Sequence, residues 1–204
     1  MKPVVPINCL IQGCYNPEFE AAIAIAKDKC YEYNKLKITD REGQASILKD
    51  LLGKMGKECF ITPPFWCDYG YNIELGDYFY SNHNMIITDG AKVKFGDNVF
   101  VAPNCCFTTA EHALDPEQRK AGVEIAKPIT IGNNVWIGAG STILAGVTIG
   151  DNSVIGAGSV VTKDIPSGVI AVGVPCRVQR EITEQDKYKY PMHESLRDNK
   201  PITY

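Results

Sequence analysis

The chain has 204 residues, of which 45% are hydrophobic, and a formal net charge of −3. This length fits one sizeable domain or a main domain with a small appendage. The mild acidity and the lack of a Lys/Arg run argue against nucleic acid or an anionic membrane surface as a partner. The sequence offers neither an apolar run long enough for a membrane span nor a signal-peptide pattern at its start, so we expect a soluble, cytoplasmic protein.

The N-terminal segment, residues 1–58, is expected to be helical. Asn16 is a candidate N-cap with Pro17 at the first helical position, and apolar residues follow at helical spacing. A second helix is predicted to begin at a capping box formed by Thr39 and Glu42, with "GQASILKDLLGKM" as its body. We interpret the two helices as a pair that packs on one end or side of the remaining domain and covers it.

A strict six-residue period follows in the second half of the chain. Neither the 3.6-residue period of a helix nor the alternation of a simple strand predicts it. The spacing is typical of a parallel β-helix, in which one apolar residue per hexapeptide points inward and Gly or Asn occupies the tight corners. We therefore predict a mainly β, left-handed parallel β-helix over residues 59–180. The apolar positions of the period are Ile131, Ile137, Ile143, Ile149, Ile155 and Val161.

A weaker form of the same rhythm precedes the strict run and is interrupted once by an insertion. We expect residues 108–128 to form an inserted loop that protrudes, since long irregular insertions in a repeat are usually functional. Residues 181–204 show no periodicity and are expected to form a peripheral tail. A slip of two residues divides the weaker rhythm into Tyr69-Gly70, Leu75-Gly76, Ser81-Asn82 and Ile87-Thr88, and then Phe95-Gly96, Val101-Ala102 and Phe107-Thr108.

The eight cysteines could form a disulfide framework, a metal site or ordinary buried thiols. No CxxC pair occurs, and no histidine stands at ligand spacing from a cysteine pair. A repeat core of this size also needs no covalent staples, which favours reduced, buried thiols. We expect no metal site.

The inserted loop contains the strongest candidate for chemistry. His112 carries the side chain best suited to accept a proton near neutral pH. An exposed histidine without a role is the ordinary alternative, but its position inside the insertion favours a function. Glu124, in the same loop, could hydrogen-bond to His112 and fix its tautomer, or could be a surface glutamate.

Several longer motifs carry a resemblance to a known family. "PPFWCDYGYNIELGDYFYSNHN", "HALDPEQRKAGVEIAKPITIGNNVWIGAG", "GVTIGDNSVIGAGSVVTKDIP" and "GVPCRVQRE" resemble the hexapeptide-repeat sugar O-acetyltransferases of the maltose and galactoside acetyltransferase group. The resemblance implies a homotrimer of left-handed β-helices with active sites at the subunit interfaces. It also implies direct transfer of acetyl from acetyl-CoA to a sugar hydroxyl, without a metal or a covalent enzyme intermediate.

The same resemblance implies roles for individual residues. His112 matches the catalytic histidine, Asn82 matches an asparagine close to the reacting thioester, and Asp68 lies where the family contacts the acceptor. The backbone N–H of Ala139 is our candidate donor to the oxyanion. Lys163, Arg177 and Arg180 would supply charge for the coenzyme's phosphates. The implied coenzyme-binding residues are Asn82, Ala139, Ala157, Thr162, Lys163, Arg177 and Arg180, with Trp136 beside them.

The sequence departs from the family mainly on the acceptor side. Ala113 follows the catalytic histidine where the family usually has proline, Asn16 stands where relatives carry aspartate, and Gly90 replaces an acidic residue. Another small hydroxyl or amine acceptor therefore stays open. A non-catalytic trimeric scaffold would not need the basic pair after "GVPC". A γ-carbonic-anhydrase-like metalloenzyme would need three grouped histidines, whereas His83 and His193 are at the wrong spacing and are interpreted as structural.

Overall fold

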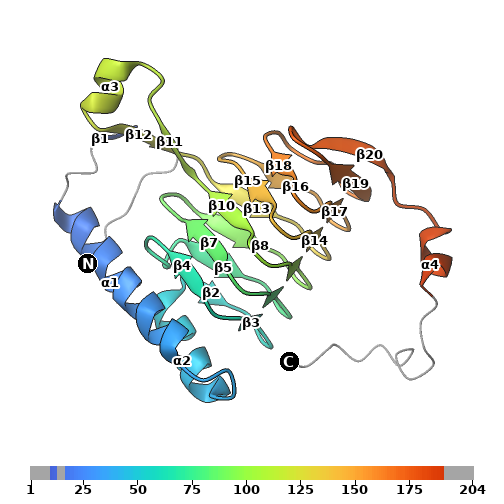
Figure 1. The fold of residues 1–204 in the computed structure, drawn as a ribbon, viewed down its shortest axis with the longest axis horizontal. Coiled ribbons are helices and arrows are strands. Elements are labelled where there is room, and N and C mark those ends of the chain that lie inside the picture. Colours follow the sequence, from blue (N-terminus) through green and yellow to red (C-terminus); the bar gives the residue numbers. More distant parts are fainter. Residues whose placement is uncertain (1–9, 13–16, 191–204) are drawn as a thin grey trace.

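The computed structural model describes residues 10–12 and 17–190, which form a left-handed β-helix with a helical pair at its N-terminal end (Figure 1). Three β-sheets make its walls, and the chain visits them in turn. Sheet 1 contains β2 (Lys54–Met55), β5 (Ile73–Leu75), β8 (Val93–Phe95), β13 (Ile129–Ile131) and β16 (Thr148–Ile149). Sheet 2 contains β3 (Phe60–Ile61), β6 (Tyr80–Ser81), β9 (Phe100–Val101), β14 (Trp136–Ile137), β17 (Val154–Ile155), β19 (Val169–Val172) and β20 (Arg177–Glu181). Sheet 3 contains β4 (Phe65–Cys67), β7 (Met85–Thr88), β10 (Cys106–Thr108), β15 (Thr142–Ile143) and β18 (Val160–Val161).

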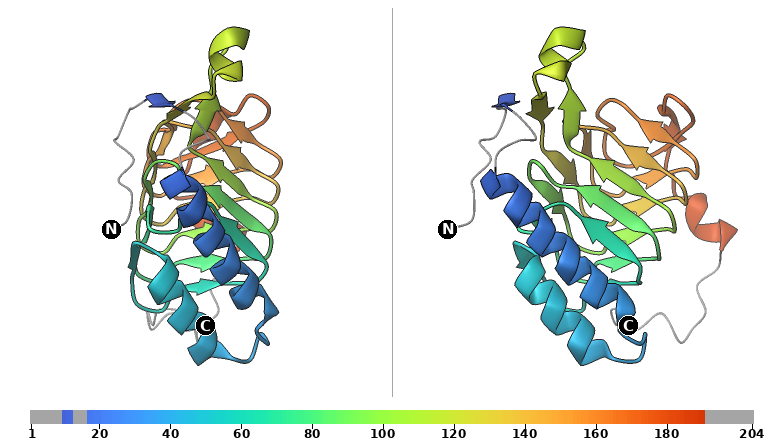
Figure 2. Two further views of the ribbon diagram at one scale, coloured as in Figure 1. Left: turned by 90° about the vertical axis from the view of Figure 1, so that its left-hand side faces the viewer. Right: turned by 60° about the vertical axis from the view of Figure 1, so that its left-hand side comes forward.

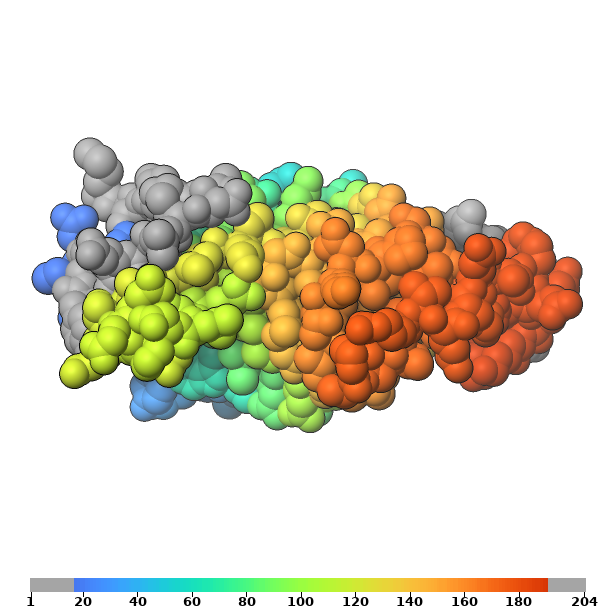
Figure 3. All heavy atoms as spheres, turned by 90° about the horizontal axis from the view of Figure 1, so that it is seen from above, coloured from blue at the N-terminus to red at the C-terminus, as the bar shows by residue number. Residues whose placement is uncertain are grey.

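All neighbouring strands in these sheets are parallel except β19 and β20, which form an antiparallel pair at the C-terminal end. Successive coils lie side by side along the long axis of the molecule, as the space-filling view from above shows (Figure 3). None of the helices in the described part of the chain is long and apolar enough to cross a membrane.

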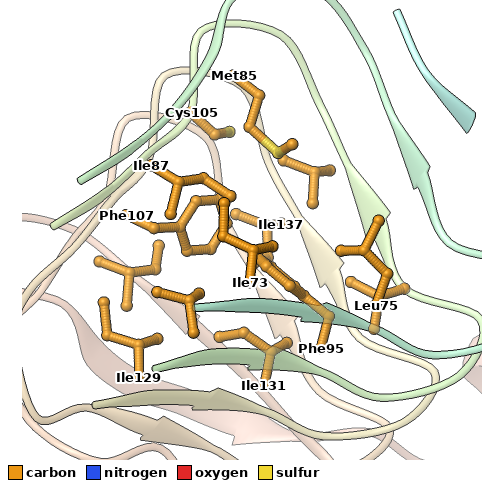
Figure 4. Packing of buried hydrophobic residues seen from close by; sticks show 14 of the residues in the cluster. Ile73, Leu75, Met85, Ile87, Phe95, Cys105, Phe107, Ile129, Ile131 and Ile137 are labelled. Carbon is orange, nitrogen blue, oxygen red and sulfur yellow. The ribbon is translucent and has the colours of Figure 1, made fainter. Parts of the chain in front are cut away.

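The interior of the β-helix is filled by one or two side chains from each strand. All six apolar positions of the strict period are at most 1% exposed, which confirms the predicted inward face. Figure 4 shows how side chains from the three walls meet: Ile131 from sheet 1, Ile137 from sheet 2 and Phe107 from sheet 3 point toward one another. Phe95 and Phe107 pack edge to face, with ring centroids 5.0 Å apart.

The weaker rhythm has a different register at its start. The predicted inward position Tyr69 is wrong, because Cys67 is buried in β4 and Tyr69 is only half-buried. A coil here is 20 residues long, as the pairing of Tyr80 with Phe100 shows, whereas Trp136 pairs with Val154 in an 18-residue coil. The two extra residues lie in the turn between sheet 3 and sheet 1: five residues separate the buried Cys67 and Ile73, whereas three separate Ile143 and Val147. A slip therefore precedes β5 as well as β8.

Asparagine and glycine occupy the corners, where the backbone must adopt a positive φ that other residues rarely tolerate. On one corner, between sheet 2 and sheet 3, Asn84 and Asn104 have φ of 61°, and Gly140 and Gly158 have φ of 69° and 70°. The side-chain amide of Asn84 also donates to Asn104 Oδ1 at 2.9 Å. These residues stack on successive coils, so each coil turns at the same place.

The helical pair consists of α1 (Pro17–Lys35) and α2 (Arg41–Leu51), which lie side by side against the first coils (Figure 2). α1 buries Ala26, Cys30 and Tyr33, which share one face of the helix. The Tyr33 hydroxyl donates to the carbonyl of Ile61 in β3. The first helical residue of α1 is Pro17, whereas the predicted cap at Asn16 lies outside the described residues.

The predicted capping box of the second helix is wrong. Asp40 is the N-cap, and its Oδ1 accepts the N–H of Gly43 at 3.0 Å. An N-cap side chain bonds to the N–H two or three residues ahead, so a helix that begins at Arg41 leaves Thr39 one residue too early. The helix also ends sooner than predicted: Leu52 is extended, and β2 (Lys54–Met55) already belongs to the first coil.

The insertion between β10 and β13 is ordered rather than irregular. It contains β11 (Ala110–His112), the short helix α3 (Pro116–Lys120) and β12 (Val123–Ala126). β12 pairs antiparallel with β11 on one side and with β1 (Leu10–Gln12) on the other. The insertion projects from the wall of the β-helix (Figures 1 and 2). The C-terminal part of the described chain adds α4 (Asp186–Lys189) after β20.

The cysteines of the described segments are all free thiols. Four of them, Cys30, Cys67, Cys105 and Cys176, are buried, while Cys59 and Cys106 are half-buried. Cys9 and Cys14 lie outside the described residues.

Ile149→Ala should lower the free energy of unfolding by about 2–5 kcal/mol, because it leaves a cavity between coils whose neighbours cannot collapse fully. Thr148→Ala is the matched control, since Thr148 is the exposed neighbour on the same strand, β16. Urea unfolding at one protein concentration measures both. Equal losses in the two variants would contradict the assignment of inward and outward positions.

Candidate active site

The predicted site residues fall on two different corners of the β-helix. We call the corner between sheet 2 and sheet 3 corner A, and the corner between sheet 3 and sheet 1 corner B. Asn82 follows β6 at corner A, and Ala139 and Ala157 follow β14 and β17 there. The N–H of Gly158 donates to the carbonyl of Ala139 at 2.8 Å, so these turns stack on adjacent coils. Trp136 lies on the outer face of sheet 2, in the strand that leads into corner A, and is 53% exposed.

Corner B holds the other group. Asp68 follows β4, Thr162 and Lys163 follow β18, and the insertion that bears His112 leaves after β10. The hydroxyls of Thr88 and Thr108 are 2.9 Å apart at this corner and join two coils. Thr162 and Lys163 are exposed.

The strands of sheet 3 separate the two corners. The segment from Asn82 to Thr88 spans the wall through β7, which corresponds to roughly 20 Å at about 3.3 Å per residue. One chain therefore places Asn82 and the base of the insertion that bears His112 at opposite edges of sheet 3.

His112 is held on a hydrogen-bonded strand. It lies at the end of β11, directly opposite Glu124 of β12, and its side chain is exposed. Cross-strand partners in an antiparallel pair place their side chains on the same face. An ion pair at 2.5 Å joins Glu111 Oε2 of β11 to Nζ of Lys127, the residue directly after β12.

The turn after His112 is also fixed by hydrogen bonds. The Asp115 side chain caps α3 by accepting the N–H of Gln118 at 2.9 Å. The Arg119 guanidinium donates to the carbonyls of Ala113 and Leu114 at 2.9 and 3.0 Å. The backbone that carries the imidazole is thus braced on both sides.

The buried carboxyl group of Asp89 holds the backbone at Asp68. Asp89, directly after β7, has Oδ1 as the acceptor for the N–H groups of Asp68 and Tyr69 at 3.0 and 2.9 Å. Burial raises the pKa of Asp89 to about 6, and the two backbone N–H groups oppose part of that rise. Asp89 Oδ2 is buried without a hydrogen-bond partner in the described part of the chain. The carboxyl group fixes the turn that presents Asp68.

Asp68 also forms an ion pair with the helical segment. Lys27 of α1 places its ammonium 2.8 Å from Asp68 Oδ1, with both side chains partly exposed. Neither Lys27 nor Asp89 was predicted from the sequence. The only available signal for Asp89 was an aspartate directly beside Gly90, a position already singled out, and nothing in the sequence signalled that Lys27 would reach corner B.

Aromatic residues surround the turn that follows Asp68. Tyr69 packs against Tyr71 and Phe19, with ring centroids 5.4 and 6.2 Å away. Burial raises the pKa of the Tyr69 phenol, and the nearby Tyr71, Asp68 and Glu124 raise it further. The hydroxyl of Thr109, at the base of the insertion, donates to the carbonyl of Thr88 at 2.7 Å, directly before the Asp89 that holds Asp68. The base of the insertion and Asp68 therefore belong to one region of corner B.

The two C-terminal arginines differ in their surroundings. Arg180 forms a bidentate ion pair with Asp186, with N–O distances of 2.8 and 2.7 Å. Its guanidinium also donates to the carbonyl of Glu181. The Arg177 guanidinium donates to the carbonyl of Cys176 at 2.7 Å. Arg180 is thus already engaged within the chain, whereas Lys163 has no ion-pair partner among the described residues. Within those same residues, no group of three His, Cys, Asp or Glu side chains is placed to hold a metal ion.

A coiled parallel β-helix with a histidine-bearing insertion defines a class, the hexapeptide-repeat transferases. The family model described as bacterial transferase hexapeptide (six repeats) matches residues 128–163, and the maltose acetyltransferase hexapeptide capping motif matches residues 14–56. A putative acetyltransferase of Saccharomyces cerevisiae is 52% identical over 186 residues, covering 91% of this chain and 94% of the relative. Galactoside O-acetyltransferase of Escherichia coli K12 is 49% identical over 164 residues, covering 80% of this chain and 81% of the relative.

Solved structures agree with these sequence matches. Galactoside acetyltransferase in complex with coenzyme A superposes with a TM-score of 0.84 at 44% identity, covering 89% of this chain and 90% of that one. A maltose O-acetyltransferase from Clostridium difficile 630 gives a TM-score of 0.83 at 43% identity, covering 84% and 92%. The chain belongs to the maltose and galactoside acetyltransferase group of hexapeptide-repeat acetyltransferases, and it is an acyltransferase.

Asp89→Asn should change how stability depends on pH. The pKa of Asp89 rises from the usual 3.8 to about 6 on folding, so the stability due to this group is fully present below pH 4 and is lost as the pH rises through 6. The free energy of unfolding of the wild type should therefore fall relative to Asp89→Asn by up to about 3 kcal/mol between pH 4 and 7. Urea unfolding at fixed salt and protein concentration across this range measures the difference.

Asp28→Asn, the same change at an exposed position of α1, is the control. A difference between the wild type and Asp89→Asn that stays constant from pH 4 to 7 would contradict the prediction.

Proposed function

We propose that this enzyme transfers the acetyl group of acetyl-CoA to a hydroxyl of a sugar, of the maltose or galactoside type, with His112 as the general base. The observation that carries the proposal is the position of His112 on a braced strand, opposite Glu124 and in the same region as Asp68. The names of the relatives, galactoside and maltose O-acetyltransferases, support the acceptor class, and the coenzyme A complex of a structural neighbour supports the donor.

The proposed chemistry is a single direct transfer. The neutral imidazole of His112 accepts the proton of the acceptor hydroxyl while the oxygen attacks the thioester carbonyl. The tetrahedral oxyanion that forms needs a positioned donor, for which the backbone N–H of Ala139 and the amide of Asn82 are the candidates. Collapse of this intermediate expels the thiolate of coenzyme A, which takes the proton back from the His112 imidazolium. A thioester is already activated, so the proposed reaction uses no metal and no covalent enzyme intermediate.

On the acceptor side, we assign Asp68 as a hydrogen-bond acceptor for sugar hydroxyls. Lys27 neutralises part of its charge, and the Asp89 carboxyl group holds its backbone in place. Glu124 is assigned to orient the His112 imidazole, because cross-strand register places their side chains on one face.

On the donor side, we assign corner A and the C-terminal coils to the coenzyme. Ala139 and Ala157 have small side chains on stacked turns, which leaves the backbone open to an extended ligand such as the pantetheine arm. Lys163 and Arg177 supply positive charge for the phosphates, and Arg180 does so while Asp186 holds its guanidinium. Thr162 and Trp136 complete the proposed coenzyme-binding set.

We further propose that the enzyme is a homotrimer with each site shared by two subunits. Corner A of one subunit would face corner B of the next, which unites Asn82 and Ala139 with the neighbour's catalytic histidine. Contacts of this head-to-tail type close into a ring when the rotation permits.

The outward-facing side chains of the three sheets support such a ring. Sheet 1 presents polar residues, whereas sheets 2 and 3 present mainly apolar ones. Apolar rows of this length on two walls are typical of an interface rather than of a free surface. The outward rows are Lys54, Glu74, Lys94, Thr130 and Thr148 on sheet 1; Phe60, Tyr80, Phe100, Trp136, Val154 and Ile170 on sheet 2; and Trp66, Ile86, Cys106, Thr142 and Val160 on sheet 3.

Sedimentation velocity should show one wild-type species near three chain masses. Ile86→Asp places a charge in the apolar row of sheet 3 and should dissociate the trimer, with loss of activity because the shared site is lost. Thr148→Asp, on the polar row of sheet 1, should leave both the trimer and the activity intact. A monomeric wild type with full activity would refute the shared site.

His112→Ala should lower kcat by roughly 10²–10⁴ and leave the KM for acetyl-CoA nearly unchanged, because the substitution removes a proton acceptor and no coenzyme contact. Release of free thiol from acetyl-CoA, with a galactoside and with maltose as acceptors, measures both constants. Lys163→Ala is the matched control: it should raise the KM for acetyl-CoA about tenfold or more and spare kcat. Near-wild-type turnover of His112→Ala at saturating acetyl-CoA would end the general-base proposal.

A further inference from the structure

Two buried thiols face each other where the helical pair meets the β-helix (Figure 2). Cys30 of α1 and Cys67 of β4 are 37 residues apart in the sequence, and their Sγ atoms are 3.6 Å apart. Both side chains are at most 1% exposed, and the acetyl transfer proposed above uses neither of them. We propose that Cys30 and Cys67 are a redox-modification site. A hydroperoxide converts the two thiols into a disulfide that ties α1 to β4, and a thiol reductant reverses the change.

Contacts on either side of the thiol pair fix how α1 lies along β4. Lys27, one turn before Cys30, forms an ion pair with Asp68 at 2.8 Å. Asn34, one turn after Cys30, exchanges two hydrogen bonds with the backbone of Phe65: its Nδ2 donates to the carbonyl at 2.9 Å, and its Oδ1 accepts the N–H at 2.8 Å. These three residues of α1 are three and four positions apart, so they share one face of the helix. The helix therefore docks in one register, and that register keeps the two sulfur atoms side by side.

The two thiols ionise differently. A hydrogen bond from the Cys67 thiol lowers the pKa of Cys30, and the positive charge of Lys27 lowers it further, while burial opposes both. The pKa of Cys67 is raised well above its usual value by the neighbouring Cys30 and by burial. The thiolate is the form of cysteine that reacts with peroxides. Cys30 is therefore the sulfur that reacts first, and Cys67 keeps its proton until the second step.

The oxidation takes two steps when hydrogen peroxide is the oxidant. The Cys30 thiolate attacks one peroxide oxygen, the O–O bond breaks, and Cys30 becomes a sulfenic acid while the other oxygen leaves as water with the thiol proton. The Cys67 sulfur then attacks Cys30 Sγ, the S–O bond breaks, and the oxygen leaves as a second water with the Cys67 proton. Two thiols lose two electrons in total, and the peroxide gains them. A disulfide needs about 2.05 Å between its sulfurs, so the pair has to close by only about 1.5 Å from its 3.6 Å contact.

The burial of the pair controls when this reaction occurs. A hydroperoxide reaches the sulfurs only while α1 is locally separated from β4, a type of partial opening that folded proteins undergo without unfolding as a whole. The disulfide then opposes that same opening, because a cross-link between distant residues disfavours the state in which they are apart. Oxidation therefore fastens the helical pair to the first coils.

The test treats the full native chain with hydrogen peroxide near neutral pH, alkylates the remaining thiols and maps disulfides by mass spectrometry of proteolytic peptides. We expect a disulfide that joins the peptide of Cys30 to the peptide of Cys67, and dithiothreitol should restore both thiols. Amide hydrogen exchange in α1 around Cys30 should slow about tenfold or more in the oxidised protein. Exchange in β15 and β18, on distant coils of the same wall, should not change.

Three variants localise the effect. Cys30→Ala and Cys67→Ala each remove one sulfur, so peroxide should no longer slow exchange in α1. Cys106→Ala removes a half-buried thiol of β10 and should form the disulfide as the wild type does. Each variant is compared with itself before and after oxidation, so that a change in stability due to the substitution cancels.

Two results would overturn the proposal. One is a peroxide-treated wild type in which Cys30 and Cys67 stay unlinked or pair with other cysteines. The other is a mapped disulfide between them that leaves exchange in α1 unchanged, which would show that the bond does not fasten the helix. Both results come from the wild type, so the proposal stays testable even if a cysteine variant folds poorly.

Discussion

The structure depends on one constraint: nearly every strand of the parallel coils must turn an apolar side chain into an interior that is closed on three sides. The interior is narrow, so the side chains that fill it come from all three walls and touch across the axis, as Phe95 and Phe107 do. This requirement sets the six-residue period and places asparagine or glycine at the corners. It places no such requirement on the residues of the outer faces, which can therefore differ from one wall to the next. The candidate site residues therefore come mainly from the corners and the insertion.

Most of the β-helix could be predicted because its constraint is local and repetitive. Every sixth residue from Ile131 is apolar, and no other regular structure accounts for that spacing. The register at Tyr69 could not be predicted in the same way, because a longer turn between sheet 3 and sheet 1 adds two residues per coil without changing the character of the sequence. The cap of α2 was misplaced by one residue since threonine and aspartate are adjacent and both are good caps.

The sequence predicted only some of the residues of the candidate site, and the structure revealed the others. The sequence pointed to His112 through its position in the insertion, and to the coenzyme-binding set through resemblance alone. The buried carboxyl of Asp89 and the reach of Lys27 to Asp68 are long-range results of packing, which no local pattern encodes. The separation of Asn82 from His112 is likewise a property of the fold, because residues only 30 apart in the sequence lie at opposite edges of one wall.

The closed coil also limits how such a protein can change its length. A deletion inside a wall shifts every later side chain relative to the interior, so only whole coils of 18 or 20 residues can be gained or lost without exposing the core. A corner has no such restriction, since the chain leaves and re-enters at the same place, as it does between β10 and β13. The segment at a corner can therefore be exchanged while the coils that hold the fold together keep their sequence.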